Sequence, residues 1–160
     1  MVVPQYLNWL STPITFNRDD HHDRVIAAGV YPLVVDPIIV NTRLSKVLMD
    51  GSSSLNIIYL ETLDLLDIKR TQLQPSAGSF HGVVPRKKAL PVGRIDLPVC
   101  FGTAANFRKE VLTFEVVGFR GTYHAIIRYP GYAKFMAIPN YTSKAKDAWA
   151  QGGYHRQLLL

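Results

Sequence analysis

The sequence predicts an all-β fold with short strands, many turns and one or two short helices. Short apolar runs recur along the 160 residues, and 10 prolines and 11 glycines are spread between them. Gly and Pro between short apolar runs are typical of strands joined by tight turns. Because 48% of the residues are hydrophobic, the chain can bury a core, and its composition is not that of a disordered protein.

The first strands are expected between residues 31 and 49. Residues 31–40 (YPLVVDPIIV) and 44–49 (LSKVLM) are apolar runs, and residues 41–43 between them are expected to form a turn. The second run stops abruptly at Asp50, which is followed by one glycine and three serines at 51–54. This change from apolar to small polar residues predicts a loop at the end of a strand.

The remaining pattern is again mostly β. Leucines at helical spacing predict one short helix over residues 60–68. A two-armed hairpin with a basic tip is expected over 80–101, and its return arm is a half-buried strand, because apolar residues alternate at Ile95, Leu97 and Val99. Further strands are expected over 111–119 and 123–127, followed by a helical turn around 132–135.

The chain is expected to hold one domain. Residues 1–30 include a densely polar segment and are interpreted as a lead-in to the domain, which occupies residues 31–141. Residues 142–160 are polar and mixed in character, and we expect them to form a divergent, flexible tail.

Charge and composition limit the classes of function. The formal net charge of +6 permits binding to nucleic acid, but the basic residues are scattered, so nucleic-acid association is only an alternative. No apolar run approaches the ~20 residues of a membrane span, and the first ten residues lack the Lys or Arg of a signal peptide. The single cysteine permits no intramolecular disulfide. An intracellular, cytoplasmic protein without membrane contact is expected.

Asp50 is the strongest candidate for a chemical role. A carboxylate that follows an apolar strand and precedes Gly51, Ser52 and Ser53 lies on a tight loop, where backbone N–H groups can approach it. Such an aspartate can activate a water if a second carboxylate shares its proton. The sequence holds no second loop of this kind, so two chains would each have to contribute one Asp50. The alternative is an ordinary Asp-Gly turn between strands.

Other polar residues favour structural roles. The acidic and histidine residues at 19–23 lack the spacing at which side chains converge on one ion, so no metal is expected. His124 is expected to be a packed, hydrogen-bonded strand residue, and Cys100 a small core residue. Residues 51–55 match neither the Gly-x-Ser-x-Gly elbow of a serine hydrolase nor the Gly-Lys-Ser/Thr end of a phosphate loop.

The order of these elements resembles the retropepsin family of aspartic proteases. The resemblance is greatest to the protease domain of plant gypsy-type LTR retrotransposon polyproteins, of which this chain looks like a degenerate, truncated copy. It covers about residues 14–141 and is carried by eight segments: ITF (14–16), YPLVVDP (31–37), KVLMDG (46–51), LNI (55–57), IDLPV (95–99), LTFEVVGF (112–119), GTYHAI (121–126) and YAKFMAIPNY (132–141).

The resemblance implies a small closed barrel that pairs as a homodimer. Asp50 would be the catalytic residue, on an active loop made by Gly51, Ser52 and Ser53. The hairpin over about 80–90 would be a flap over an extended peptide or polyprotein substrate, with Gly82 allowing it to bend and Val83 and Val84 contacting the substrate. The resemblance implies hydrolysis by an activated water, without metal, cofactor or covalent intermediate. The other alternative is a catalytically silent module for dimerisation or peptide binding.

Two positions depart from the pattern of the family. Ser52 stands where retropepsins usually have a glycine, and Arg128 stands where a glycine usually follows the late Ala-Ile-Leu strand. The Cβ atom of Ser52 is expected to crowd a backbone N–H that should approach the carboxylate. Arg128 would bring a bulky charge close to the active loop, at an energetic cost if it is buried.

Overall fold

The structure is a computed structural model, which describes residues 15, 32–52, 54–76, 80–84, 87–89, 91–104, 107–139 and 145–147. For 80–84, 87–89, 139 and 145–147 it describes the backbone alone. The predicted lead-in over 1–30, with its acidic and histidine segment at 19–23, lies outside the described residues except for Thr15.

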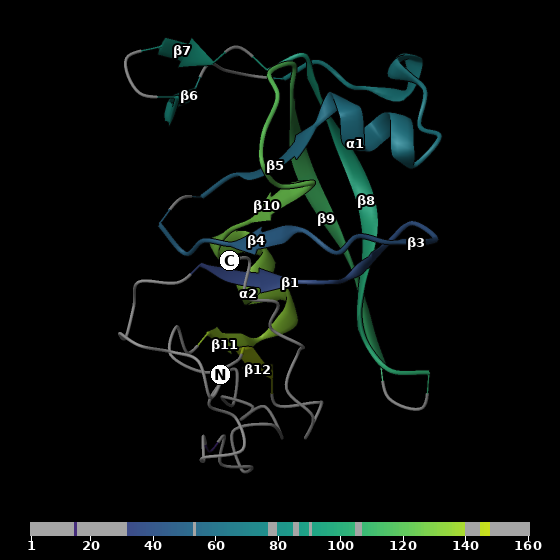
Figure 1. The fold of residues 1–160 in the computed structure, drawn as a ribbon, viewed down its shortest axis with the longest axis vertical. Helices are drawn as coiled ribbons and strands as arrows, with labels where there is room; N and C mark the ends of the chain where they lie inside the picture. Colours follow the sequence, from purple (N-terminus) through teal and green to yellow (C-terminus); the bar gives the residue numbers. More distant parts are fainter. Residues whose placement is uncertain are drawn as a thin grey trace, which may run out of the picture.

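Eight strands form one sheet, in the order β1-β4-β10-β5-β9-β8-β2-β3 (Figure 1). The strands are β1 (Leu33–Val35), β2 (Ile38–Ile39), β3 (Thr42–Arg43), β4 (Val47–Met49), β5 (Asn56–Tyr59), β8 (Gly93–Gly102), β9 (Phe107–Val117) and β10 (Ala125–Ile127). β1 and β2 lie towards opposite ends of this order, although only Asp36 and Pro37 separate them along the chain. Two intervening residues span roughly 11 Å at most. The sheet must therefore curl until its ends meet, which confirms the prediction of a small closed β fold.

The core lies inside the curled sheet. β8 and β9 pair antiparallel from Gly93↔Val116 to Gly102↔Phe107. Along β8 the buried side chains are Ile95, Leu97, Val99 and Phe101, so the predicted alternation of a half-buried strand is confirmed. Their partners on β9 include the buried Leu112 and Phe114. Together with inward residues of the other strands, these side chains make up most of the main apolar cluster.

Two short helices cover the ends of that core. α1 (Leu60–Leu65) is shorter than the predicted 60–68 but buries Leu63 and keeps Glu61 and Asp64 exposed. α2 (Tyr129–Phe135) is longer than the predicted turn, has Pro130 in its first turn, and ends where Met136 takes the left-handed conformation, with φ 50°. It buries Tyr132 and Phe135 against the main cluster. A 3₁₀ turn, η3 (Arg70–Gln72), follows α1.

Two predictions about local structure are wrong. Residues 41–43 are not the turn, because Ile39 pairs with Thr42 and the chain reverses at Val40 and Asn41. Val40 adopts φ 58°, a conformation that β-branched residues rarely take, so the sequence did not indicate a turn there. Cys100 is not in the core, since it is only partly buried and belongs to neither core cluster. Strand alternation, which points Val99 and Phe101 inwards, points Cys100 outwards.

Two small sheets lie beside the barrel. β6 (Phe80–Val84) and β7 (Lys87–Ala89) pair antiparallel, and in Figure 1 this hairpin extends away from the eight strands. It is shorter than the predicted hairpin over 80–101, because the predicted return arm belongs to β8, which pairs with β9 instead. β11 (Ala137–Pro139) pairs with β12 (Ala145–Asp147), so part of the predicted tail is paired. The rest of 142–160 lies outside the described residues. Within the described part of the chain, no helix is long and apolar enough to cross a membrane.

Candidate active site at Asp50

Parallel pairing of β4 with β10 places the backbone of Asp50. The register joins Leu48 to Ile126 and Met49 to Ile127. Asp50 is the first residue after β4, and its backbone N–H donates to the carbonyl oxygen of Ile127 at 2.9 Å. The sheet hydrogen bonding therefore continues one residue past β4 and fixes the start of the loop.

The loop turns its donors towards the carboxylate, as the sequence predicted for a chemically useful aspartate. The backbone N–H of Ser52 donates to Oδ1 of Asp50 at 3.0 Å, and the Ser52 side chain makes a further hydrogen bond to the same carboxylate. The backbone N–H of Ser52 thus reaches the carboxylate although this residue carries a Cβ atom. Gly51 belongs to this described turn, whereas Ser53 lies outside the described residues.

Arg128 lies beside Asp50 on the same side of the sheet. Its terminal NH2 nitrogen is 3.8 Å from Oδ2 of Asp50, and the two side chains are 12% and 32% exposed, respectively. The Nε atom of Arg128 is buried and has no hydrogen-bond partner within the described part of the chain. The backbone of Arg128 is extended, with φ −120° and ψ −168°, so this position does not require the conformational freedom of glycine.

Opposing effects set the charge of Asp50. Burial by itself raises the pKa of the Asp50 carboxyl, because it disfavours the charged form. The hydrogen bonds from the side chain and backbone of Ser52, and then the positive charge of Arg128, together outweigh burial and hold the pKa below its ordinary value. In this single chain, Asp50 is thus an ionised carboxylate at neutral pH.

Asn56 supports the site, although the sequence analysis assigned it no role. Its side chain is 4% exposed, donates through Nδ2 to the carbonyl oxygen of Thr113 at 3.0 Å, and accepts from the backbone N–H of Arg128 at 2.8 Å. It therefore ties β5 to β9 and to the start of α2. The sequence signal for this role was a single amide side chain within the apolar run at 55–59. All four residues of β5, including Asn56, are buried.

A mostly buried apolar cluster lies next to Asp50. Ile126 pairs with Leu48 on one side and with Ile57 on the other. Because side chains alternate along a strand, these three lie on the same face of the sheet as Asp50 and Arg128, two residues further along. Ile57 and Ile126 belong to a second apolar cluster, against which Leu48 is partly buried. Ile57 and Ile126 are buried, so Leu48 is the one of these three side chains that is partly exposed to contact a peptide.

A small hollow follows the Asp50 loop. It has a volume of about 180 Å³, large enough for a side chain, and is lined by Ser54, Leu55, Asn56, Leu112, Thr113, Glu115, Pro130 and Lys134. One carboxylate oxygen of Glu115 is buried without a hydrogen-bond partner among the residues that the structure describes. The hollow is therefore partly polar and lies on the β9 side of the loop.

The structure places His124 as a packed residue. Its backbone N–H donates to Lys46 O at 2.8 Å, and its carbonyl oxygen accepts from the Thr62 hydroxyl at 2.6 Å. Burial, and then the charge of Lys46, lowers the pKa of its imidazole, and the ring Nδ1 is buried without a partner in the described ranges. Among the described residues, no three His, Cys, Asp or Glu side chains are grouped to hold a metal ion.

Comparisons with known proteins give a similarity in structure but none in sequence. No family model matches the sequence, and no curated protein matches it. Among solved structures, the chain is similar to the crystal structure of the retroviral protease-like domain of Ddi1 from Leishmania major. The TM-score is 0.48 and the sequence identity is 16%, and the match covers 68% of this chain and 79% of that chain. In the present structure, the strand before Asp50, the short helix, the hairpin and the two later strands follow the order that the sequence resemblance implies.

Proposed function

We propose that this chain is an aspartic endopeptidase domain of the retropepsin type, derived from a plant retrotransposon polyprotein and acting in the cytoplasm as a homodimer. The observation that supports this proposal most is the position of Asp50. It follows an apolar strand, its backbone is tied to β10, and its carboxylate accepts the backbone N–H of Ser52. A pair of carboxylates would then come from two copies of the chain, since the sequence contains one such loop.

The proposed reaction is hydrolysis of a peptide bond by water. One Asp50, as carboxylate, takes a proton from the water while the oxygen of that water attacks the peptide carbonyl carbon. The Asp50 of the second copy, as carboxylic acid, gives its proton to the carbonyl oxygen. The tetrahedral diol then collapses, a proton passes to the amide nitrogen, and the C–N bond breaks to give a carboxylic acid and an amine. The acid form of one Asp50 is therefore essential.

An extended peptide or polyprotein segment is the proposed substrate. Leu48, which is partly exposed on the same face of the sheet as Asp50, favours peptides with an apolar side chain next to the cleaved bond. The β6–β7 hairpin is proposed as the flap, with Gly82 as its flexible point and Val83 and Val84 as substrate contacts. A peptide would bind mainly through main-chain hydrogen bonds, as an added strand.

A second candidate function is peptide binding without hydrolysis. The contact between Arg128 and Asp50 favours it, because a guanidinium beside the carboxylate opposes the acid form that hydrolysis needs. In this case the fold and the binding of an extended peptide would be kept while hydrolysis is lost.

Cleavage of a random peptide library between about pH 4 and 7 tests the first candidate. The wild-type protein is compared with Asp50→Asn and with Asp64→Asn, an exposed carboxylate on α1 that serves as a matched control. We expect cleavage by the wild type and the control, with a loss on the order of 10²–10⁴-fold in Asp50→Asn. Sedimentation reports pairing of the chains. A folded protein that binds peptides but never cleaves them would overturn the endopeptidase proposal in favour of the second candidate.

A further inference from the structure

The two departures from the family pattern act on the same carboxylate. Ser52 approaches Oδ1 of Asp50 with its backbone N–H, and its side chain adds another hydrogen bond. Arg128 approaches Oδ2 with a positive charge. Glycine at either position would provide neither the hydroxyl group nor the guanidinium. Both side chains therefore add favourable interactions to the ionised form of Asp50.

Arg128 is held in place from two sides. Its backbone N–H donates to Oδ1 of Asn56, and its side chain is 12% exposed. The Asn56 amide is itself fixed, because it is 4% exposed and donates to Thr113 O. The guanidinium is thus a packed group with restricted movement, unlike an arginine on an open surface.

Arg128 is the one cation, among the described residues, whose charge acts on Asp50. The other elements packed around Asp50 present apolar or neutral groups to it. On β1, which pairs with β4, the strand residues are Leu33, Val34 and Val35, and all are apolar. β5 ends in Tyr59, a neutral phenol whose pKa burial raises, with Arg128 opposing that effect. Lys46 and His124 lie before the starts of β4 and β10, whereas Asp50 lies after the end of β4.

We propose that Ser52 and Arg128 are positioning residues that hold Asp50 as a carboxylate and thereby restrain hydrolysis at this site. The inference rests on the proposed function, because it concerns the acid–base chemistry of the same residue. Two nearby carboxylates share one proton because both cannot readily ionise together. Each copy of this chain brings its own guanidinium and hydroxyl to its own carboxylate, which stabilises the doubly ionised pair. The proton that must pass to the peptide carbonyl is then absent at neutral pH.

Carbon-13 NMR titration of the Asp50 carboxyl tests this inference directly. The titration compares wild type, Ser52→Gly, Arg128→Gln, the double variant and Arg128→Lys, each shown to be folded by its amide spectrum. We expect the pKa of Asp50 to rise in both single variants and to rise most in the double variant. In Arg128→Lys, which keeps the positive charge, the pKa of Asp50 should rise less than in Arg128→Gln. Arg43→Gln is the control, since Arg43 pairs with Asp36 and is 57% exposed.

The titration separates this inference from the proposed function, because it requires neither activity nor a second chain. An Asp50 pKa that is the same in wild type and in the folded double variant would overturn the inference, even if the wild type cleaves peptides. A raised pKa in a double variant that still cleaves nothing would confirm that Ser52 and Arg128 hold Asp50 as a carboxylate, and would overturn the endopeptidase proposal together with the restraint on hydrolysis.

Discussion

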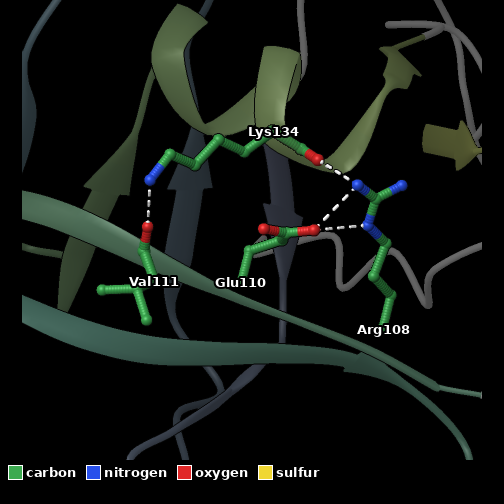
Figure 2. Close-up of polar contacts among 4 residues, drawn as sticks. All are labelled: Arg108, Glu110, Val111 and Lys134. Atoms are coloured by element: carbon green, nitrogen blue, oxygen red, sulfur yellow. Dashed lines mark hydrogen bonds and ion pairs between the residues drawn. The ribbon is translucent and has the colours of Figure 1, made fainter.

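Two partly buried arginines beside carboxylates, Arg108 and Arg128, differ in how closely their side chains contact their partners. Arg108 donates through Nε to Glu110 at 2.8 Å and through NH2 to the Lys134 carbonyl oxygen at 2.7 Å. Figure 2 shows this cluster, in which Lys134 also bonds to the carbonyl oxygen of Val111. Arg128 instead makes one ion pair, in which its NH2 nitrogen is 3.8 Å from Oδ2 of Asp50.

This difference indicates different roles. The Arg108 cluster joins the C-terminal end of α2 to the outer part of β9, and short charge-assisted hydrogen bonds of this kind are among the stronger polar interactions in proteins. Arg128 contributes little to holding elements together through its side chain, because its backbone N–H alone makes the bond to Asn56. Its charge acts mainly on Asp50. We infer that Arg108 supports the fold, whereas Arg128 adjusts the site.

The largest expected effect on stability is at Asn56, which anchors the backbone of Arg128. Asn56→Ala removes two hydrogen bonds and leaves the Thr113 carbonyl and the Arg128 N–H without their buried partner. We expect a loss of about 2–4 kcal/mol in the free energy of unfolding, measured with urea. Asn41→Ala, at an exposed turn residue, is the control. A loss similar to the control would contradict the anchoring role.

The comparison of the two arginines predicts a smaller effect for each of them. Arg108→Ala should destabilise the fold by about 1–2 kcal/mol, because it removes the contacts to Glu110 and Lys134. Arg128→Ala should have a smaller effect, because its one side-chain contact is long. Arg120→Ala, from a pair with Glu61 in which Arg120 is 91% exposed, should change little. Greater destabilisation by Arg128→Ala than by Arg108→Ala would contradict the inference that Arg108 supports the fold and Arg128 adjusts the site.

Acid should reveal the role of Ser52 and Arg128 in stability. Since the folded pKa of Asp50 lies below the ordinary aspartate value of 3.8, this group stabilises the fold above that pH. That contribution is lost as the pH falls through 3.8 and then through the folded pKa. In the Ser52→Gly/Arg128→Gln double variant, the acid-dependent loss should be smaller. Denaturation curves between about pH 2 and 6 measure this loss of unfolding free energy. An equal loss in wild type and in the double variant would contradict the role of Ser52 and Arg128.

The smallest expected effect comes from His124. Its folded pKa is lowered from 6.5, so the unfolded chain takes up the proton first as the pH falls. Stability should therefore decrease as the pH falls from above 6.5 towards the folded pKa, and His124→Gln should remove this part of the dependence. The same dependence of unfolding free energy on pH around 6.5 in wild type and in His124→Gln would contradict this prediction.

The sequence predicted the fold better than the contacts of the site. Strict alternation at Ile95, Leu97 and Val99, and leucine spacing in α1, follow from local geometry and are confirmed. The turn at Val40 was missed because its conformation is set by the pairing of β2 with β3 and with β8. The position of Asp50 at the end of a strand was predictable, since it depends on neighbours in sequence.

The contacts of Asn56 could not be predicted, because they depend on residues distant in sequence. Asn56 meets Thr113 and Arg128, which are 57 and 72 positions away in the chain. Likewise, Arg128 meets Asp50 only because β4 and β10 are parallel neighbours. The sequence marked Arg128 as unusual, but the parallel register explains which carboxylate it affects.

The most direct measurement is the rate of peptide cleavage by the Ser52→Gly/Arg128→Gly variant, relative to wild type and to the same variant carrying Asp50→Asn. Restoring both glycines leaves the backbone bond from residue 128 to Asn56 available, because that bond uses the main-chain N–H. We predict cleavage at least on the order of tenfold faster than wild type near pH 6, abolished by Asp50→Asn. A folded, paired double-glycine variant that cleaves no faster than wild type would contradict the account.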